Sequence, residues 1–143
     1  MRVERARTVA APPEAVWALV ADPHRLPAWW PRTERVEGVT EAGWTSVLRS
    51  PRGQVVRADQ RLNASEPPRR RAWEQALAGT PFERLLRESA TEVRLEPDGG
   101  GTSVTLAARR RLRGLNRLGT PLLGRAMARE LDEALAALAR VLE

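Results

Sequence analysis

Apolar residues recur at gaps of three or four positions through the C-terminal stretch, residues 120–143. The positions that share this spacing are Leu123, Met127, Leu131, Ala134, Leu135, Leu138 and Leu142. Residues spaced in this way lie on one face of an α-helix, and the charged residues between them fall on or near the other face. A lone long helix buries its apolar face by packing on a sheet, so we expect this helix to lie across one.

The region from residue 32 to residue 113 instead has the pattern of strands separated by turns. Strands are predicted near residues 33–40, 44–50, 55–64, 70–77, 83–96 and 102–113. The segments between them contain glycine or proline, which supply the positive or fixed φ that a chain reversal needs. Because these connections are short, we expect consecutive strands to pair as antiparallel hairpins.

The N-terminal part of the chain adds one more strand and two short helices. Residues 2–10 place a few apolar positions among charged ones, which is typical of an edge strand. Pro13 suits an early position of a first helix, and a second, very short helix is predicted through Trp29 and Trp30. The predicted fold class is therefore α+β, in the order strand, two short helices, six strands and one long helix.

Alternation along each strand assigns its side chains to two faces, and we expect the more apolar face to meet the helix. The predicted lining of that space is mostly apolar with a few polar positions. The candidates for a cavity lining are Gln60, Trp73, Gln75, Arg87, Ser89 and Arg110 from the strands, and Leu123 and Met127 from the helix. An apolar cavity that holds a few polar groups is the usual form of a small-molecule site.

Trp29 and Trp30 complete the candidate lining. Adjacent residues of a helix point about 100° apart, so one of these rings can pack fully while the other lines the cavity mouth. Arg87 and Arg110 lie on strands predicted to be hairpin neighbours, which brings their guanidinium groups together. Two inward-facing cations would need an anionic partner, so we expect a ligand with a carboxylate or phenolate. The alternative is that both arginines reach solvent at the strand ends.

A chain of 143 residues is long enough for one domain with a single core, and we expect one domain over residues 1–143. There is no cysteine and only one histidine, His24, so we predict neither a metal site nor a cofactor. His24 could serve as an acid–base group near the cavity mouth, but a lone histidine in a turn is more often solvated. No apolar run could span a bilayer and no apolar signal segment opens the chain, so we expect a cytoplasmic protein.

The net charge is +6, and all 24 basic residues are arginine. We favour a compositional origin for this excess, because the arginines are scattered among 18 acidic residues. The alternative is an arginine-rich interaction protein that binds RNA, a ribosome or an anionic membrane through residues 109–113 and Arg117. Strand alternation weakens this alternative, since Arg109 and Arg111 would face opposite to Arg110, and we do not expect a nucleic-acid partner.

The order of elements and several short segments resemble the SRPBCC superfamily, which includes START lipid-transfer domains and a polyketide cyclase/dehydrase group. The segments that carry the resemblance are APPEAVW at 11–17, DPHRLPAW at 22–29, EPPRR at 66–70, the Gly-Thr turn before the last strand and LDEAL at 131–135. The resemblance covers essentially the whole chain. It implies a helix-grip fold, in which a seven-stranded curved antiparallel sheet wraps around the C-terminal helix with a cavity between them. It implies no shared catalytic residues.

We therefore expect a protein that binds a hydrophobic or aromatic small molecule in the cavity between the sheet and the C-terminal helix. The missing tyrosine and the lack of an obvious carboxylate pair make binding without chemistry the preferred interpretation. Transport of the ligand and a cyclase- or dehydrase-type conversion both stay open at this point.

Overall fold

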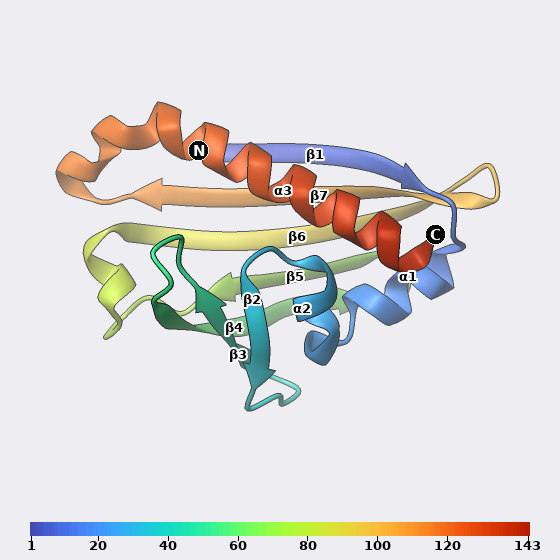
Figure 1. Ribbon diagram of the computed structural model, residues 1–143, viewed down its shortest axis with the longest axis horizontal. Coiled ribbons are helices and arrows are strands. Elements are labelled where there is room, and N and C mark those ends of the chain that lie inside the picture. The colour runs from blue at the N-terminus through green and yellow to red at the C-terminus, as the bar shows by residue number, and fades with distance from the viewer.

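The computed structural model describes residues 1–143 and shows one sheet with a long helix across it (Figure 1). The helices are α1 (Pro13–Val20), α2 (Leu26–Trp29) and α3 (Thr120–Leu142). The strands are β1 (Arg2–Val9), β2 (Thr33–Glu37), β3 (Gly43–Arg49), β4 (Val55–Glu66), β5 (Arg70–Gln75), β6 (Leu86–Asp98) and β7 (Gly101–Leu112). Three 3₁₀ turns are η1 (Pro23–Arg25), η2 (Pro81–Arg84) and η3 (Gly114–Gly119). The predicted order of elements is confirmed.

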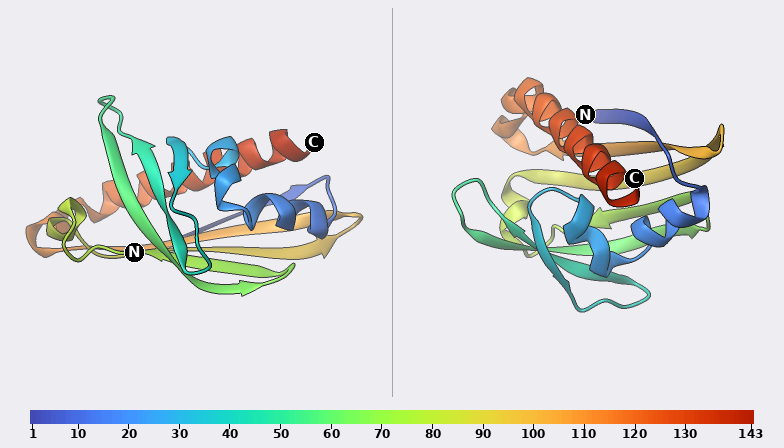
Figure 2. Two further views of the ribbon diagram at one scale, coloured as in Figure 1. Left: turned by 90° about the horizontal axis from the view of Figure 1, so that it is seen from below. Right: turned by 45° about the vertical axis from the view of Figure 1, so that its right-hand side comes forward.

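All seven strands join one antiparallel sheet in the order β1-β7-β6-β5-β4-β3-β2, so β1 and β2 form its two edges. The sheet is strongly curved, and β2, β3 and β4 rise out of the plane of β1, β7 and β6 toward the side on which α3 lies (Figure 2). The helix therefore lies in the concavity of the sheet. This is the helix-grip arrangement that the resemblance to the SRPBCC superfamily implies.

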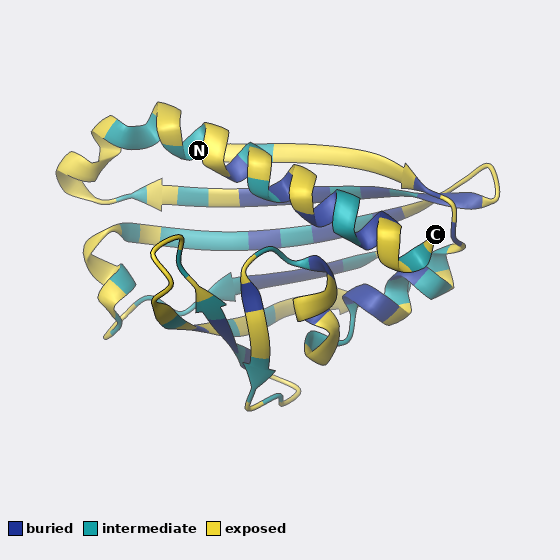
Figure 3. Cartoon of the chain, in the orientation of Figure 1, coloured by how far each residue is buried: buried dark blue, intermediate teal, exposed yellow.

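The apolar face of α3 forms the centre of the core, as its spacing predicts. Its buried positions are Met127, Leu131, Ala134, Leu135, Leu138 and Ala139. Leu123 and Leu142, near the two ends of the same face, are partly buried. Beneath the helix, β6 and β7 contribute side chains with almost no exposed surface, namely Val93, Leu95, Val104 and Leu106. In Figure 3 the buried positions of α3 face the sheet and the exposed ones face away from it.

The short helices close one end of this core. Pro13 stands in the first turn of α1, where its missing N–H costs no hydrogen bond, and Val16, Leu19 and Val20 are buried. Trp29 ends α2 and is only 1% exposed. The chain then leaves the helix at Trp30. As expected for adjacent residues at a helix, the Trp29 ring packs into the core and the Trp30 ring is partly accessible.

The start of β6 differs from the expected strand at residues 83–96. Residues 81–84 form η2 instead, where Pro81 fixes φ and the Thr80 hydroxyl accepts a hydrogen bond from the Phe82 N–H. The register of β6 with β7 then shifts between Leu86 and Glu88, so that Arg87 is an extra residue in a β-bulge. A bulge interrupts strict alternation, and the face on which Arg87 lies cannot be counted from the residues that follow it.

Candidate functional site

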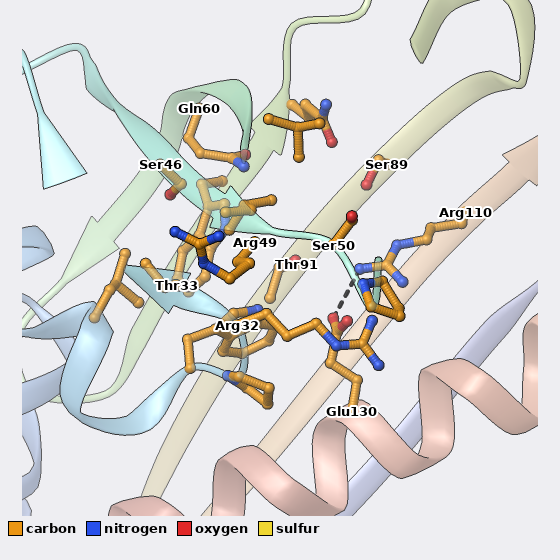
Figure 4. A pocket seen from close by; sticks show the side chains of 18 residues that line it. Arg32, Thr33, Ser46, Arg49, Ser50, Gln60, Ser89, Thr91, Arg110 and Glu130 are labelled. Carbon is orange, nitrogen blue, oxygen red and sulfur yellow. Dashed lines mark hydrogen bonds and ion pairs between the residues drawn. The ribbon is translucent and has the colours of Figure 1, made fainter. Parts of the chain in front are cut away.

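A cavity of about 260 Å³ lies between the curved sheet, the α2–β2 connection, the β3–β4 hairpin and α3 (Figure 4). It is partly open to solvent. Only five of its 18 lining residues are hydrophobic: Leu26, Trp30, Leu48, Val56 and Trp73. The space is therefore more open, and lined by more polar residues, than the enclosed apolar cavity expected from the sequence.

The structure brings together several of the residues predicted to line the cavity. Those that line it are Trp30, Gln60, Trp73, Gln75, Ser89 and Arg110. Each strand residue of this set lies on the face assigned to it by alternation. The strand register explains why these side chains meet, because Gln60 pairs with Gln75 across β4 and β5, and Ser89 pairs with Arg110 across β6 and β7.

The other candidates lie elsewhere. Trp29 and Met127 are packed into the core with 1% and 0% of their surface exposed, so neither reaches the cavity. Leu123 lies at the start of the helix face and packs at the edge of the core. Arg87 is exposed at the β6 bulge and lines a separate surface depression with Met1 and Arg117. The cavity thus touches Trp30 and Trp73, as expected, but not Met127.

An ion pair between β7 and α3 forms one wall of the cavity. The Nη2 atom of Arg110 donates to Oε1 of Glu130 at 2.9 Å, and both side chains are largely buried, with 21% and 24% exposed. Arg110 therefore points inward, but its anionic partner is Glu130 of the same chain rather than the expected ligand, and Arg87 does not line the cavity beside it. The sequence does contain a signal for Glu130, because it lies three residues after Met127 and four before Ala134, beside the buried face of α3.

Arg32 and Arg49 add positive charge at the mouth of the cavity. The guanidinium of Arg49 is engaged by Glu34 and by the carbonyl oxygen of Gly53. Arg32 makes no side-chain hydrogen bond or ion pair, and Figure 4 shows it extending toward Arg110 and Glu130. Its backbone has φ of 63°, an uncommon conformation for a residue with a Cβ, and the Arg32 carbonyl accepts a hydrogen bond from the Arg49 N–H at 2.9 Å. Sequence reasoning missed both residues because they flank turns.

Aromatic rings form the inner wall of the cavity. The rings of Trp30 and Trp73 meet edge to face with centroids 6.1 Å apart, and Trp73 meets Trp44 in the same way at 5.6 Å. Beside Trp73, Gln75 places its Nε2 amide nitrogen in a buried position without a hydrogen-bond partner. A buried donor without an acceptor costs roughly 1–3 kcal/mol. The cavity wall thus combines an aromatic surface with a glutamine whose buried amide nitrogen has no partner within the protein.

His24 takes no part in this site. It is exposed on η1, and its backbone N–H donates to Oδ1 of Asp22 at 3.0 Å. This contact stabilises the turn, and the His24 side chain does not line the cavity. No group of three or more His, Cys, Asp and Glu side chains is placed to hold a metal ion. None of the helices is both long enough and apolar enough to cross a membrane.

A curved antiparallel sheet that holds a C-terminal helix over a partly open cavity defines the START-like class of helix-grip proteins. The chain matches the family model described as "Polyketide cyclase / dehydrase and lipid transport" over residues 1–143. This protein belongs to that family, and the resemblance to the SRPBCC superfamily is confirmed. Among curated proteins, none matches the chain in sequence.

Solved structures with the same fold are numerous. A START superfamily protein from Mycobacterium smegmatis superposes with a TM-score of 0.80 at 13% identity, covering 99% of this chain and 96% of that one. The di-domain ARO/CYC protein StfQ of the steffimycin biosynthetic pathway superposes with a TM-score of 0.79 at 14% identity, covering 99% of this chain and 50% of that one. A Rhodobacter sphaeroides protein gives a TM-score of 0.72 at 26% identity, covering 99% and 90%. The likeness to the first two shows the shared fold alone.

Proposed function

We propose that this protein binds a small amphipathic molecule in the cavity between the sheet and α3. The hydrophobic or aromatic body of the ligand lies against Trp30 and Trp73, and an acceptor group faces Gln75 and the arginines of the cavity mouth. The family description, which combines cyclase, dehydrase and lipid transport, supports a hydrophobic ligand. The START and ARO/CYC names of two structural neighbours support the same class of ligand.

The observation that carries this proposal is the unpartnered Nε2 of Gln75 in the cavity wall. An amide in this position gains a full hydrogen bond when a ligand brings an acceptor, because no internal bond has to be broken first. Arg32 is in the same situation at the mouth, since its guanidinium has no internal partner. The exposed Arg32 guanidinium is free to bind an acceptor, whereas Arg110 is already engaged by Glu130. The Nε2 of Gln75 has almost no accessible surface, so the Gln75 amide binds an acceptor by turning toward the cavity.

The dimensions of the cavity restrict the ligand further. Drug-sized ligands occupy pockets of about 300–1,000 Å³, and this cavity of about 260 Å³ lies just below that range. A small aromatic acid or a short acyl chain suits such a space better than an intact lipid with two chains. The unpaired positive charge of Arg32 favours a carboxylate or phenolate as the acceptor.

A direct test compares a small aromatic carboxylic acid with its uncharged alcohol by titration calorimetry, after native mass spectrometry has searched the purified protein for a retained molecule. We expect the acid to bind about tenfold or more tightly than the alcohol, because a hydrogen bond to a charged group contributes about 1.5–3 kcal/mol. Arg32→Met should remove this difference without leaving a buried carboxylate unpaired. Gln75→Leu should weaken both ligands.

Arg69→Met is the matched control, because Arg69 is exposed, lies outside the cavity and carries the same charge. It should leave both affinities unchanged. Equal binding of acid and alcohol by the parent protein, unaffected by Gln75→Leu, would refute the proposed site. Loss of binding in the Arg69 control would show that general attraction to a basic protein, rather than the cavity, is responsible.

Glu130 favours a second candidate function, conversion of the bound molecule. It is the only carboxylate that lines the cavity, and a carboxylate within hydrogen-bond reach of a ligand can act as a general base. If the protein catalyses such a step, Glu130→Gln should abolish turnover while the ligand still binds. If the protein only binds its ligand, the same variant should change affinity alone, and no product should form with either protein.

A further inference from the structure

Three leucines are strongly exposed at the end of the molecule where β7 passes into α3. Leu115, Leu118 and Leu122 have 87%, 84% and 70% of their surface exposed, the largest values among the large hydrophobic residues of this protein. They belong to η3 and to the first turn of α3, which extend beyond the end of the sheet (Figures 1 and 3). Nothing within the chain covers them.

The local geometry brings these leucines onto a common side. Residues three apart eclipse one another in a 3₁₀ helix, so Leu115 and Leu118 project in the same direction from η3. The chain continues into α3 without a break, and Leu122 follows Leu118 by about one turn of α-helix. The result is a short apolar ridge rather than scattered single residues.

The ridge is bordered by arginines that have no carboxylate partner. From Arg109 to Arg129 the sequence contains neither Asp nor Glu. The exposed arginines around the ridge that form no ion pair are Arg84, Arg87, Arg113, Arg117 and Arg125. Arg84 belongs to this region because its carbonyl oxygen accepts a hydrogen bond from Asn116 in η3 at 3.4 Å. We call Leu115, Leu118 and Leu122 together with these five arginines the leucine–arginine surface.

Several arginines on the outer face of the sheet, by contrast, form ion pairs with glutamates. Arg61 pairs with Glu74, Arg70 with Glu66 and Glu92, and Arg94 with Glu4 and Glu92. The general excess of arginine therefore does not by itself explain the leucine–arginine surface. What distinguishes this surface is the combination of unpaired positive charge with uncovered aliphatic side chains.

We propose that the leucine–arginine surface docks on an anionic lipid bilayer. Apolar side chains inserted at the boundary of headgroups and acyl chains, with basic residues around them, are the combination that holds interfacial segments on membranes. The leucines enter this boundary while the arginines bind lipid phosphates. A nucleic acid would satisfy the arginines but would give three exposed leucines little apolar surface to bury, since its phosphates are charged and unpaired RNA bases stack on aromatic side chains and arginine planes.

The position of this surface gives docking a further consequence. Arg110 lines the ligand cavity and also lines the neighbouring depression that contains Arg87 and Arg117. The leucine–arginine surface and the cavity are therefore neighbours on the molecule. Docking would hold the cavity close to the membrane, although the docking proposal itself stands without any assumption about the ligand.

Co-sedimentation with vesicles tests the proposal. The full chain should sediment with vesicles of equal parts phosphatidylcholine and phosphatidylglycerol and remain in the supernatant with pure phosphatidylcholine. The double variant Arg113→Gln/Arg117→Gln should bind more weakly, by about fivefold for each arginine removed. Arg7→Gln/Arg69→Gln is the matched control, because both residues are exposed, form no ion pair and lie away from the surface. It loses the same charge and should bind as the parent does.

The leucines separate membrane docking from simple attraction to a polyanion. Leu115→Ser/Leu118→Ser keeps every arginine, and because both side chains are exposed its melting temperature should match that of the parent. Its affinity for the anionic vesicles should fall about tenfold or more. An unchanged affinity would overturn the proposal and leave a purely electrostatic surface. Tighter binding to a single-stranded RNA than to vesicles, insensitive to the leucine substitutions, would also overturn it and favour a nucleic-acid partner.

The absence of native cysteine permits a site-specific readout of insertion. A polarity-sensitive fluorophore attached to Leu118→Cys should shift to the blue and brighten when anionic vesicles are added. The same fluorophore on Val141→Cys, at the opposite end of α3, should not respond. Equal responses at both positions, or none at Leu118, would refute insertion of the ridge.

Discussion

Replacement of Leu131 by alanine tests whether α3 organises the core. Leu131 has 0% of its surface exposed and lies in the middle of the buried face of the helix. The substitution removes three carbon atoms, which forfeits about 2.4 kcal/mol of transfer free energy at ~0.8 kcal/mol for each carbon. The sheet on one side and α2 on another restrict collapse around the site, so the unfilled volume should raise the loss to about 3–5 kcal/mol.

Thermal melting followed by circular dichroism measures this loss. For a chain of 143 residues, 1 kcal/mol corresponds to about 3 °C, so Leu131→Ala should lower the melting temperature by roughly 9–15 °C. Leu122→Ala is the matched control, since it makes the same substitution in the same helix at a side chain that is 70% exposed. Its stability should stay within about 0.5 kcal/mol of the parent. If the two variants melt together, the packing of α3 on the sheet does not hold the core.

Two further predictions concern charged groups. A hydrogen bond from Arg2 holds the pKa of Glu4 below its ordinary value of 4.5. The stability that this contact contributes is therefore present above pH 4.5, and it is lost as the pH falls through the lower pKa of the folded state. In urea titrations Glu4→Gln should therefore lose less stability between neutral and acidic pH than the parent; an identical loss would exclude this contribution. Burial lowers the pKa of Arg71, although the charge of Asp22 acts in the opposite direction. The guanidinium forms no ion pair; it donates to Ser65 at 3.1 Å and lies over the Trp44 ring, 5.8 Å from its centroid. Arg71→Met should accordingly match the parent in stability or exceed it by about 1–2 kcal/mol, and a loss of more than 2 kcal/mol would contradict this balance.

The fold follows from periodic patterns that are local in the sequence. The spacing of Met127, Leu131 and Leu138 suffices to predict a helix with one buried face, because a helix repeats the same geometry at every turn. Glycine and proline between the strands indicate the hairpins in the same way. The strand order β1-β7-β6-β5-β4-β3-β2 follows once consecutive strands pair and the first strand joins the last.

The site is predicted less completely because its residues depend on exceptions to those patterns. Arg87 lies outside the cavity, at a bulge that inserts one residue into β6 and interrupts the alternation of side chains. Arg32 reaches the cavity mouth because its backbone has a positive φ. This conformation is uncommon for residues other than glycine, so it cannot be predicted from an arginine in the sequence. Glu130 is a charged residue beside an apolar helical face, and its role becomes visible only when Arg110 lies opposite to it. Gln60, Trp73 and Gln75, by contrast, lie on regular strand positions and were predicted.

The two edges of the sheet have a consequence for how copies of this protein behave toward one another. An open sheet presents unpaired N–H and C=O groups at β1 and β2, and such edges can recruit a strand from a second molecule. Both strands carry charges of both signs, in the sequences RVERARTV and TERVE. A second copy that approached edge to edge would have to desolvate these side chains along with the backbone. The charged side chains of the two edge strands thus protect the open sheet against amyloid-like growth.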